Sequence, residues 1–221
     1  MEAVLPIVVL IVVLIASVVV HEVAHAWQAR REGDDTADRL GRITLNPLPH
    51  LDPIGSVIVP LVLHFTGSGF LFGWAKPVPV NPANYRSPVW GDIRVSMAGI
   101  VSNIGLAILS TFALAIALKV QTTLGPLGGA TTLAVQAAYY GVFINLVLAF
   151  FNLIPIPPLD GSHVLFHVLP EPLALRYREA GRHGFLIMMG LLFFFPSVFR
   201  YVLWPVTFFA GLATEFARLW L

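Results

Sequence analysis

The chain is organised around one stretch, Val18-Val-Val-His-Glu-Val-Ala-His-Ala-Trp27. Within it, His21, Glu22 and His25 spell H-E-x-x-H. Residues four apart share one face of a helix, so both imidazoles can reach a single metal ion. Glu22 stands beside the first histidine, where a carboxylate can take a proton from a metal-bound water. Composition alone would place this pattern in roughly 0.6% of such chains, so the stretch predicts a metal site.

The setting of this motif is a hydrophobic run. Residues 3–20 include no charged side chain, and we expect a helix from Leu5 to Arg30 that is long enough to span a bilayer. Met1-Glu2 is acidic where a signal peptide carries positive charge, and no small-residue cleavage site precedes His21, so we expect a retained transmembrane helix. Ionisable residues at the edge of such a run are costly and usually functional.

Composition extends this interpretation to the whole chain. Of its 221 residues, 57% are hydrophobic and 11% are charged, against about 25% charged in soluble domains. We therefore expect an all-α polytopic membrane protein in the lipid bilayer, with about four to six transmembrane helices and a short strand or extended segment near the active site. A net charge of +1 gives no general attraction for nucleic acid. The absence of cysteine excludes disulfides, cysteine-ligated zinc and iron–sulfur clusters.

The remaining apolar runs set the expected topology. We expect long helices at residues 89–119 and 133–153. The run 54–65 is short and holds Pro60, which favours a re-entrant or interfacial segment, so 53–88 should make no net crossing. Residues 184–195 and 201–217 form either two short helices or one kinked span. Arginines follow the first helix, so by the positive-inside rule it ends in the cytoplasm: Arg30, Arg31, Arg39 and Arg42.

Two polar connections lie between the first two long helices. Residues 31–52 carry both signs of charge and are typical of a solvated loop. In residues 73–82, Pro77, Pro79 and Pro82 exclude a helix. The alternation at Val78 and Val80 suits an edge strand that could pair with a substrate backbone, while a plain proline-rich connector explains the same pattern.

A catalytic zinc needs a third protein ligand and an open position. Asp160 is favoured, because it lies in a turn forced by three prolines at the end of a membrane helix, where an uncompensated carboxylate would be costly. The alternatives are His163 and His167, which could equally be ordinary helix residues, the isolated His64, and His50, which we expect on the surface, together with Glu171 and Glu179. Asn103, an amide within a membrane helix, either packs helices together or faces the metal.

These motifs resemble a known family. HEVAHAW at 21–27 together with NLIPIPPLDG at 152–161 resembles the site-2 proteases, the intramembrane zinc metalloproteases of peptidase family M50. The likeness extends to residues 41–55, to residues 72–82 and to the Gly99–Asn103 helix. One departure is Ile100, where many members have proline after the glycine.

The resemblance implies a set of residue roles. His21, His25 and Asp160 would bind one Zn²⁺ per chain, and Glu22 would be the general base when a zinc-activated water attacks the scissile carbonyl. Asn152, and less directly Asn103, would bind substrate or stabilise the oxyanion. The implied reaction is cleavage of peptide bonds within or near transmembrane segments, with a single-pass membrane protein as substrate.

The resemblance also implies a minimal form of the enzyme. Residues 1–221 would form one membrane-embedded metalloprotease domain, with core motifs in 18–161, a C-terminal helical segment at 184–219, and no PDZ or CBS domain. We expect a multi-pass protein of a prokaryotic inner (plasma) membrane, with the active site toward the cytoplasm. A metal transporter would use similar ligands but should show an internal repeat. An inactive scaffold would not need Glu22.

Overall fold

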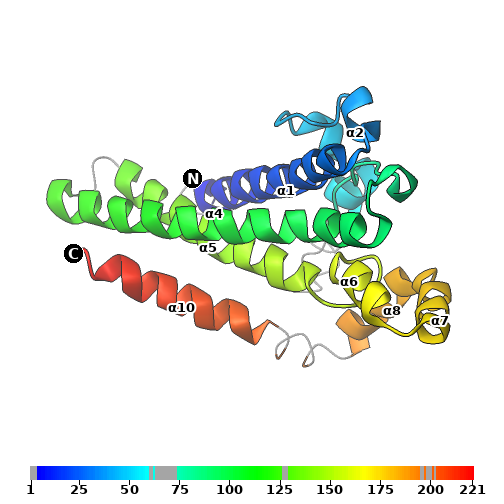
Figure 1. Cartoon of the computed structure of the whole chain (residues 1–221). Helices are drawn as coiled ribbons and strands as arrows, with labels where there is room; N and C mark the ends of the chain where they lie inside the picture. Colours follow the sequence, from blue (N-terminus) through cyan, green and yellow to red (C-terminus); the bar gives the residue numbers. More distant parts are fainter. Residues whose placement is uncertain are drawn as a thin grey trace.

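A computed structural model gives the architecture of the chain and describes residues 4–59, 62, 74–125, 129–194, 197, 201 and 203–221. Within these residues every long element is helical (Figure 1). The shorter helical elements connect or flank the long ones: α2 (Thr36–Arg39), η1 (Leu48–His50), η2 (Pro53–Ile58), η3 (Pro82–Asn84), α6 (Gly161–Val168), α7 (Glu171–Gly181) and α8 (Gly184–Phe194).

Among the described residues, three helices are long and apolar enough to cross a membrane: α1 (Val4–Glu32), α4 (Pro88–Leu124) and α5 (Ala130–Asn152). They confirm the expected helical membrane fold and lie side by side (Figure 1). At 1.5 Å per residue the 29 residues of α1 extend about 43 Å, more than the roughly 30 Å of a bilayer core. The helix α1 is therefore long enough for its last turns to extend beyond the apolar layer.

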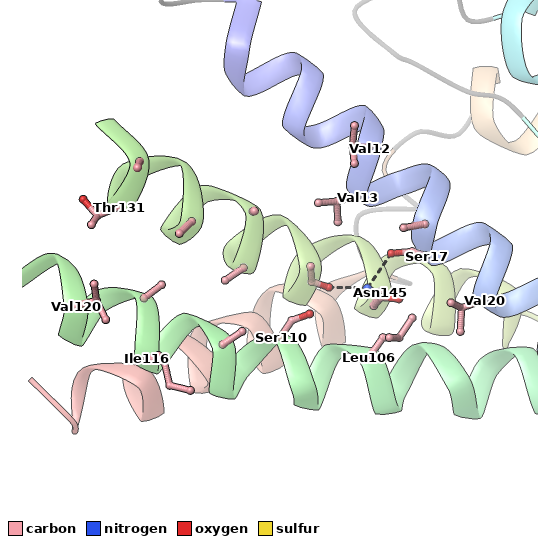
Figure 2. Close-up of a pocket in the computed structure, with 18 residues that line it drawn as sticks. Val12, Val13, Ser17, Val20, Leu106, Ser110, Ile116, Val120, Thr131 and Asn145 are labelled. Atoms are coloured by element: carbon pink, nitrogen blue, oxygen red, sulfur yellow. Dashed lines mark hydrogen bonds between the residues drawn. The ribbon is translucent and has the colours of Figure 1, made fainter. Parts of the chain in front are cut away.

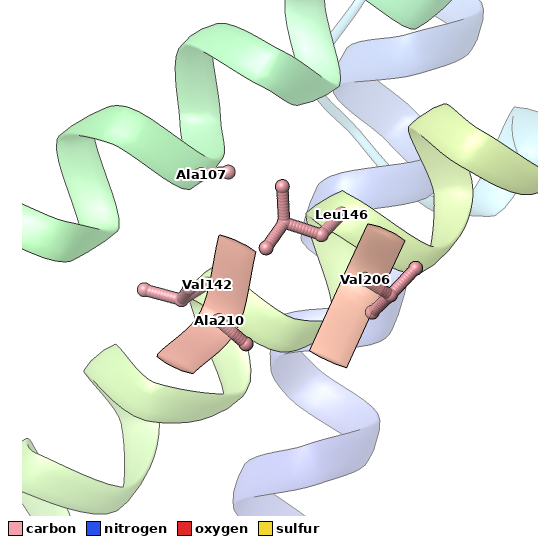
Figure 3. Close-up of a cluster of buried hydrophobic side chains, with 5 residues drawn as sticks. All are labelled: Ala107, Val142, Leu146, Val206 and Ala210. Carbon is pink, nitrogen blue, oxygen red and sulfur yellow. The ribbon is translucent and has the colours of Figure 1, made fainter. Parts of the chain in front are cut away.

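The helix α10 (Trp204–Arg218) packs along α4 and α5 (Figure 1). The contact is a cluster of small and branched apolar side chains (Figure 3): Ala107, Val142, Leu146, Val206 and Ala210. Between membrane helices, van der Waals packing of such side chains drives association, because lipid tails are as apolar as the helix surface. Within the described residues of 184–219, α8 has 11 residues and α10 has 15. Both are shorter than a typical span, so the expected count of four to six spans is not confirmed.

The end of α1 and the start of α4 lie together. Arg94 binds Glu32 through two hydrogen bonds of 2.8 and 2.9 Å, and the Arg86 backbone N–H donates to the Glu32 carbonyl at 2.7 Å. The chain between these helices therefore returns to the side on which α1 ends, as the predicted topology requires. Residues 60–61 and 63–73 lie outside the described part, and the predicted re-entrant segment with them.

The extended segment is not a strand in the described residues. Residues 74–81 have no regular structure, because Pro77 and Pro79 lack the N–H groups that a ladder would need. Their remaining backbone groups bind other partners instead: the Lys76 N–H donates to the His50 carbonyl at 2.8 Å, and Arg42 donates to the Lys76 and Pro77 carbonyls. The segment is held in place without a sheet.

The predicted solvated loop at 31–52 is wrong in part. Asp34, Arg42 and His50 are buried there, with His50 only 1% exposed. The loop is built around these polar groups. His50 Nε2 lies 3.0 Å from the Thr44 carbonyl. Asp34 accepts hydrogen bonds from the backbone N–H groups of Thr36 and Asn81. Some of its polar and charged side chains therefore hold the loop together from inside, and are not exposed to solvent.

Candidate metal centre

Three side chains converge at the inner end of α1. His21 and His25 project from one face of the helix, with ring centroids 4.6 Å apart. Asp160, which immediately precedes α6, meets them from the turn that follows α5. Its Oδ2 lies 3.3 Å from His21 Nε2 and 3.4 Å from His25 Nε2, and the two Nε2 atoms are 3.0 Å apart. Among the described residues these three form a group able to hold a metal ion.

The dimensions of this triangle fit zinc. With zinc–ligand bonds of about 2.0–2.1 Å, neighbouring ligand atoms of a tetrahedral site lie about 3.3 Å apart. Asp160 Oδ2 is buried and has no hydrogen-bond partner in the described structure. A buried carboxylate oxygen facing two imidazole nitrogens is costly without a shared cation or proton. A three-ligand donor set of two nitrogens and one oxygen is also that of a catalytic zinc site.

The outer nitrogens of both histidines are held by α4. His25 Nδ1 lies 2.7 Å from the Val95 carbonyl, and His21 Nδ1 lies 2.5 Å from Asn103 Oδ1. Such partners orient a metal-binding imidazole and select the tautomer with a free Nε2. Asn103 is fully buried behind His21, at 0% exposure, so the structure places it against the ligand and away from the cavity.

Gly99 allows α4 to approach this closely. A Cβ atom at this position would lie 2.5 Å from His21 Cε1 and 2.5 Å from His25 Nε2, and no real Cβ tolerates such contacts. The small residue in this part of the predicted helix thus serves the histidines as well as helix packing.

A cavity of about 710 Å³ opens beside the triangle. It is lined by the three converging side chains and by Glu22, Asn152, Val78 and Val80. Glu22 Oε2 accepts a 2.8 Å hydrogen bond from the Val78 N–H, and Asn152 Nδ2 donates to the Leu148 carbonyl at 2.9 Å. The residues predicted for base, substrate and strand-pairing roles therefore line one space.

The other candidate ligands are not part of the triangle, although His163 lines the same cavity. His163 and His167 both contact Asp92 Oδ2, at 3.1 and 2.8 Å, and so join α6 to α4. The hydrogen bond with Asp92 raises the pKa of His163, against the opposing effect of burial. His50 is buried in the loop after α1, and His64 lies outside the described residues. Glu171 and Glu179 are exposed on α7.

Two residues near the site were not predicted from the sequence. These residues are Asp92 in α4 and Asn145 in α5. Asn145 did carry a signal, because an amide inside an apolar helix needs a partner. The signal in Asp92 was weaker, since a carboxylate at a helix start is common.

The fold and site define a membrane-embedded metallohydrolase arrangement, and the sequence comparison identifies the family. The model of Peptidase family M50 matches residues 9–195, and the chain belongs to this family. It is 38% identical over 197 residues to "Putative zinc metalloprotease YwhC" of Bacillus subtilis (strain 168), covering 89% of this chain and 84% of that protein.

More distant relatives carry a related name. "Putative zinc metalloprotease Rip2" of Mycolicibacterium smegmatis is 32% identical over 186 residues, 80% of this chain and 63% of that protein. The protein of the same name in Mycobacterium tuberculosis is 28% identical over 185 residues, 83% of this chain and 66% of that protein. None of the solved structures matches this chain.

Proposed function

We propose that this chain is an intramembrane zinc metalloprotease that hydrolyses peptide bonds within or near transmembrane segments of other membrane proteins. The observation that carries the proposal is the convergence of the His21, His25 and Asp160 donor atoms beside Glu22, at the end of a helix able to span a bilayer. Residues 1–221 act as one membrane-embedded domain. Membership of Peptidase family M50 supports the same reaction class.

The three converging side chains hold one Zn²⁺ per chain. The two Nε2 atoms and Asp160 Oδ2 face one another, and each histidine has its Nδ1 engaged by α4. When bound, zinc supplies Lewis acidity, which lowers the pKa of a bound water and polarises a scissile carbonyl. The cavity beside His21, His25 and Asp160 is also lined by Glu22 and Asn152, so an ion held by the three side chains would be open to water and substrate.

Glu22 is the general base. Its carboxylate accepts a proton from the attacking water and later delivers it to the leaving amine. The Val78 N–H binds Oε2, so the other carboxylate oxygen remains for the water. Asn152 uses one amide hydrogen for the Leu148 carbonyl, and its second can bind the substrate oxygen on which negative charge develops.

The substrate must reach this site as extended chain, because a helix buries its peptide bonds in its own hydrogen bonds. Residues 74–80 have no regular structure, and Val78 and Val80 both line the cavity. We place the substrate backbone against this segment. A single-pass membrane protein whose helix unwinds locally fits this geometry, and its cleavage would release a fragment as a signal.

The orientation follows from charge. Arg30 and Arg31 end α1, beyond the histidines, and positive residues remain on the cytoplasmic side. We therefore place the site toward the cytoplasmic face of a prokaryotic inner membrane, where water can reach it.

The test compares the wild-type protein in detergent with Glu22→Gln, using a peptide that contains a transmembrane segment. We expect zinc to be bound by both proteins, and cleavage to fall by at least 1,000-fold in the variant, on the order of the loss when a catalytic group is removed. Glu179→Gln is the matched control, because Glu179 is exposed on α7. Undiminished cleavage by Glu22→Gln would refute the mechanism, and zinc binding without cleavage of any membrane peptide would favour a transporter or scaffold.

A further inference from the structure

A chain of buried polar side chains runs from His21 into the helix bundle. Asn103 Nδ2 donates to Asn145 Oδ1 at 2.8 Å, and Asn145 Nδ2 donates to Ser17 Oγ at 2.9 Å and to the Gly141 carbonyl at 2.8 Å. Figure 2 shows Asn145 directed at Ser17 on the neighbouring helix. Asn103 is 0% exposed and Asn145 is 2% exposed. The relay joins all three membrane helices.

The direction of every hydrogen bond in this relay is fixed at its far end. The Gly141 carbonyl can only accept, so Asn145 must turn its Nδ2 toward it. Asn145 Oδ1 then faces Asn103 and can only accept, which turns Asn103 Nδ2 toward it. Asn103 Oδ1 is left facing His21 Nδ1, which must therefore carry the ring proton. His21 Nε2 consequently keeps its lone pair, directed at Asp160 and His25.

The two histidines reach the same state by different routes. His25 Nδ1 donates directly to a backbone carbonyl, that of Val95, at 2.7 Å. His21 has a side-chain amide as its partner, and an amide that is free to rotate could present either end to Nδ1. Two backbone carbonyls orient the amide beside His21. The Ser17 carbonyl accepts a long hydrogen bond of 3.5 Å from Asn103 Nδ2, and the Gly141 carbonyl orients Asn145, whose Oδ1 accepts the shorter 2.8 Å bond from the same Nδ2.

We propose that Asn145 is a positioning residue, which fixes the orientation of Asn103 and thereby holds His21 in the tautomer and ring orientation that bind metal. The inference rests on the metal site of the proposed function but not on proteolysis. A simple packing role for Asn145 would affect the stability of the bundle and leave metal affinity unchanged.

The surroundings of Asn145 determine which substitution tests this. Asn145 and Ser17 lie at the wall of a crevice of about 800 Å³ between α1, α4 and α5, lined mainly by alkyl side chains (Figure 2). An alanine would leave room for a water that could replace the amide. Leucine has the same branched shape as asparagine, is somewhat larger and has no polar atom, so Asn145→Leu removes the relay and excludes that water. Asn145→Asp keeps an oxygen that accepts from Asn103.

The experiment measures the dissociation constant of zinc for the full-length protein in detergent, by competition with a chromogenic chelator. We expect Asn145→Leu to weaken zinc binding by about 10-fold, within the range for outer-shell partners of metal ligands, and Asn145→Asp to restore most of the loss. The absorption spectrum of the cobalt(II)-loaded protein should change in the leucine variant and return in the aspartate variant. Thr111→Val is the matched control, because its hydroxyl donates within α4, to the Ala107 carbonyl.

Each outcome decides the proposal. Equal zinc affinity in wild type and Asn145→Leu, with a lower melting temperature of the metal-free protein, would show a packing role only and overturn it. If the leucine variant does not fold, Asn145→Val is measured instead, because its branched side chain has no polar atom and leaves less room for a water than alanine does, and unchanged affinity there overturns the proposal equally. A wild-type protein that binds no zinc would refute the proposed function itself, whereas a protein that binds zinc but cleaves no peptide would leave the role of Asn145 standing.

Discussion

The Val78 backbone donates a 2.8 Å hydrogen bond to Glu22 Oε2, across 56 positions of sequence. The Val78 side chain is buried against Ala26 and Ala37, which anchors the donor. A carboxylate held by a backbone N–H cannot rotate freely, and a charge-assisted bond of this kind is among the stronger ones in proteins. The proposed base is therefore aimed by the same extended segment that we expect to hold the substrate.

Removing this donor should slow the reaction without emptying the metal site. We expect Val78→Pro, which has no N–H, to lower kcat about 10-fold at unchanged zinc content, because Glu22 loses its orientation. Val78→Ala retains the N–H and should keep most of kcat. Rates on a transmembrane peptide, with zinc measured in parallel, check this. Equal losses of kcat in both variants would show that the buried side chain, and not the N–H, matters.

The glycine behind the histidines gives a second prediction. In Gly99→Ala the new Cβ would displace the His21 and His25 rings, so we expect zinc affinity to fall at least 10-fold. Gly105→Ala lies on the same helix with no atom within 4 Å of the added Cβ, and should bind zinc as the wild type does. Chelator competition measures both. The packing argument fails if the two variants bind zinc equally well.

The sequence predicted the parts of the site that depend on local rules. The helix that carries His21 and His25 follows from a charge-free run and a spacing of four, and Asp160 was favoured because prolines force a turn at the end of an apolar helix. The prediction that the two histidines and Asp160, which follows His25 by 135 positions, form one site came from the resemblance. The relay from His21 through Asn103 to Asn145 depends on how the helices pack, and so does the contact of His25 with the Val95 carbonyl. No local sequence pattern encodes either one.

The errors have a common physical cause. The loop at 31–52 was predicted as solvated because of its charges, but Asp34 and His50 are buried with partners of their own. For residues 73–82 an edge strand and a proline-rich connector were both considered, and the strand is not confirmed: the backbone of the described residues 74–81 binds side chains and single carbonyls. In both cases polar groups were satisfied by tertiary contacts, which composition and periodicity do not reveal.

The contact between α6 and α4 should be pH-dependent. The hydrogen bond with Asp92 raises the pKa of His163 above its ordinary value of about 6.5. A raised folded-state pKa gives stability that is complete below the unfolded pKa and is lost as pH rises through the folded pKa. The melting temperature of the zinc-loaded wild type should therefore fall more than that of His163→Gln as pH rises from about 6 to 9. His183→Gln is the control, because His183 is exposed, and its melting temperature should change with pH as that of the wild type does. If the melting temperatures of wild type and His163→Gln change with pH in parallel, His163 does not contribute to the pH dependence of stability.

Asp34 should be the acid-sensitive group of the loop. Burial raises its pKa, but hydrogen bonds from Thr36, Asn81 and Asn84 outweigh burial and leave the pKa below its ordinary value. A depressed folded-state pKa gives stability that is present above the unfolded value of about 3.9 and is lost as pH falls through the folded pKa.

At neutral pH, Asp34→Ala removes the shared acceptor of the Asn81 N–H, Asn84 Nδ2 and the Thr36 hydroxyl. We expect a loss of about 2–4 kcal/mol in the free energy of unfolding, because a buried carboxylate that accepts three hydrogen bonds is removed, and hydrogen bonds to charged groups contribute about 1.5–3 kcal/mol each. Asp35→Ala is the control, since Asp35 pairs with Arg39 at the surface, where such pairs contribute little. Melting temperatures are measured in detergent from pH 3 to 7. The difference in melting temperature between wild type and Asp34→Ala should become smaller as the pH falls. A gap that stays constant with pH would mean that the charge of Asp34 does not hold the segment.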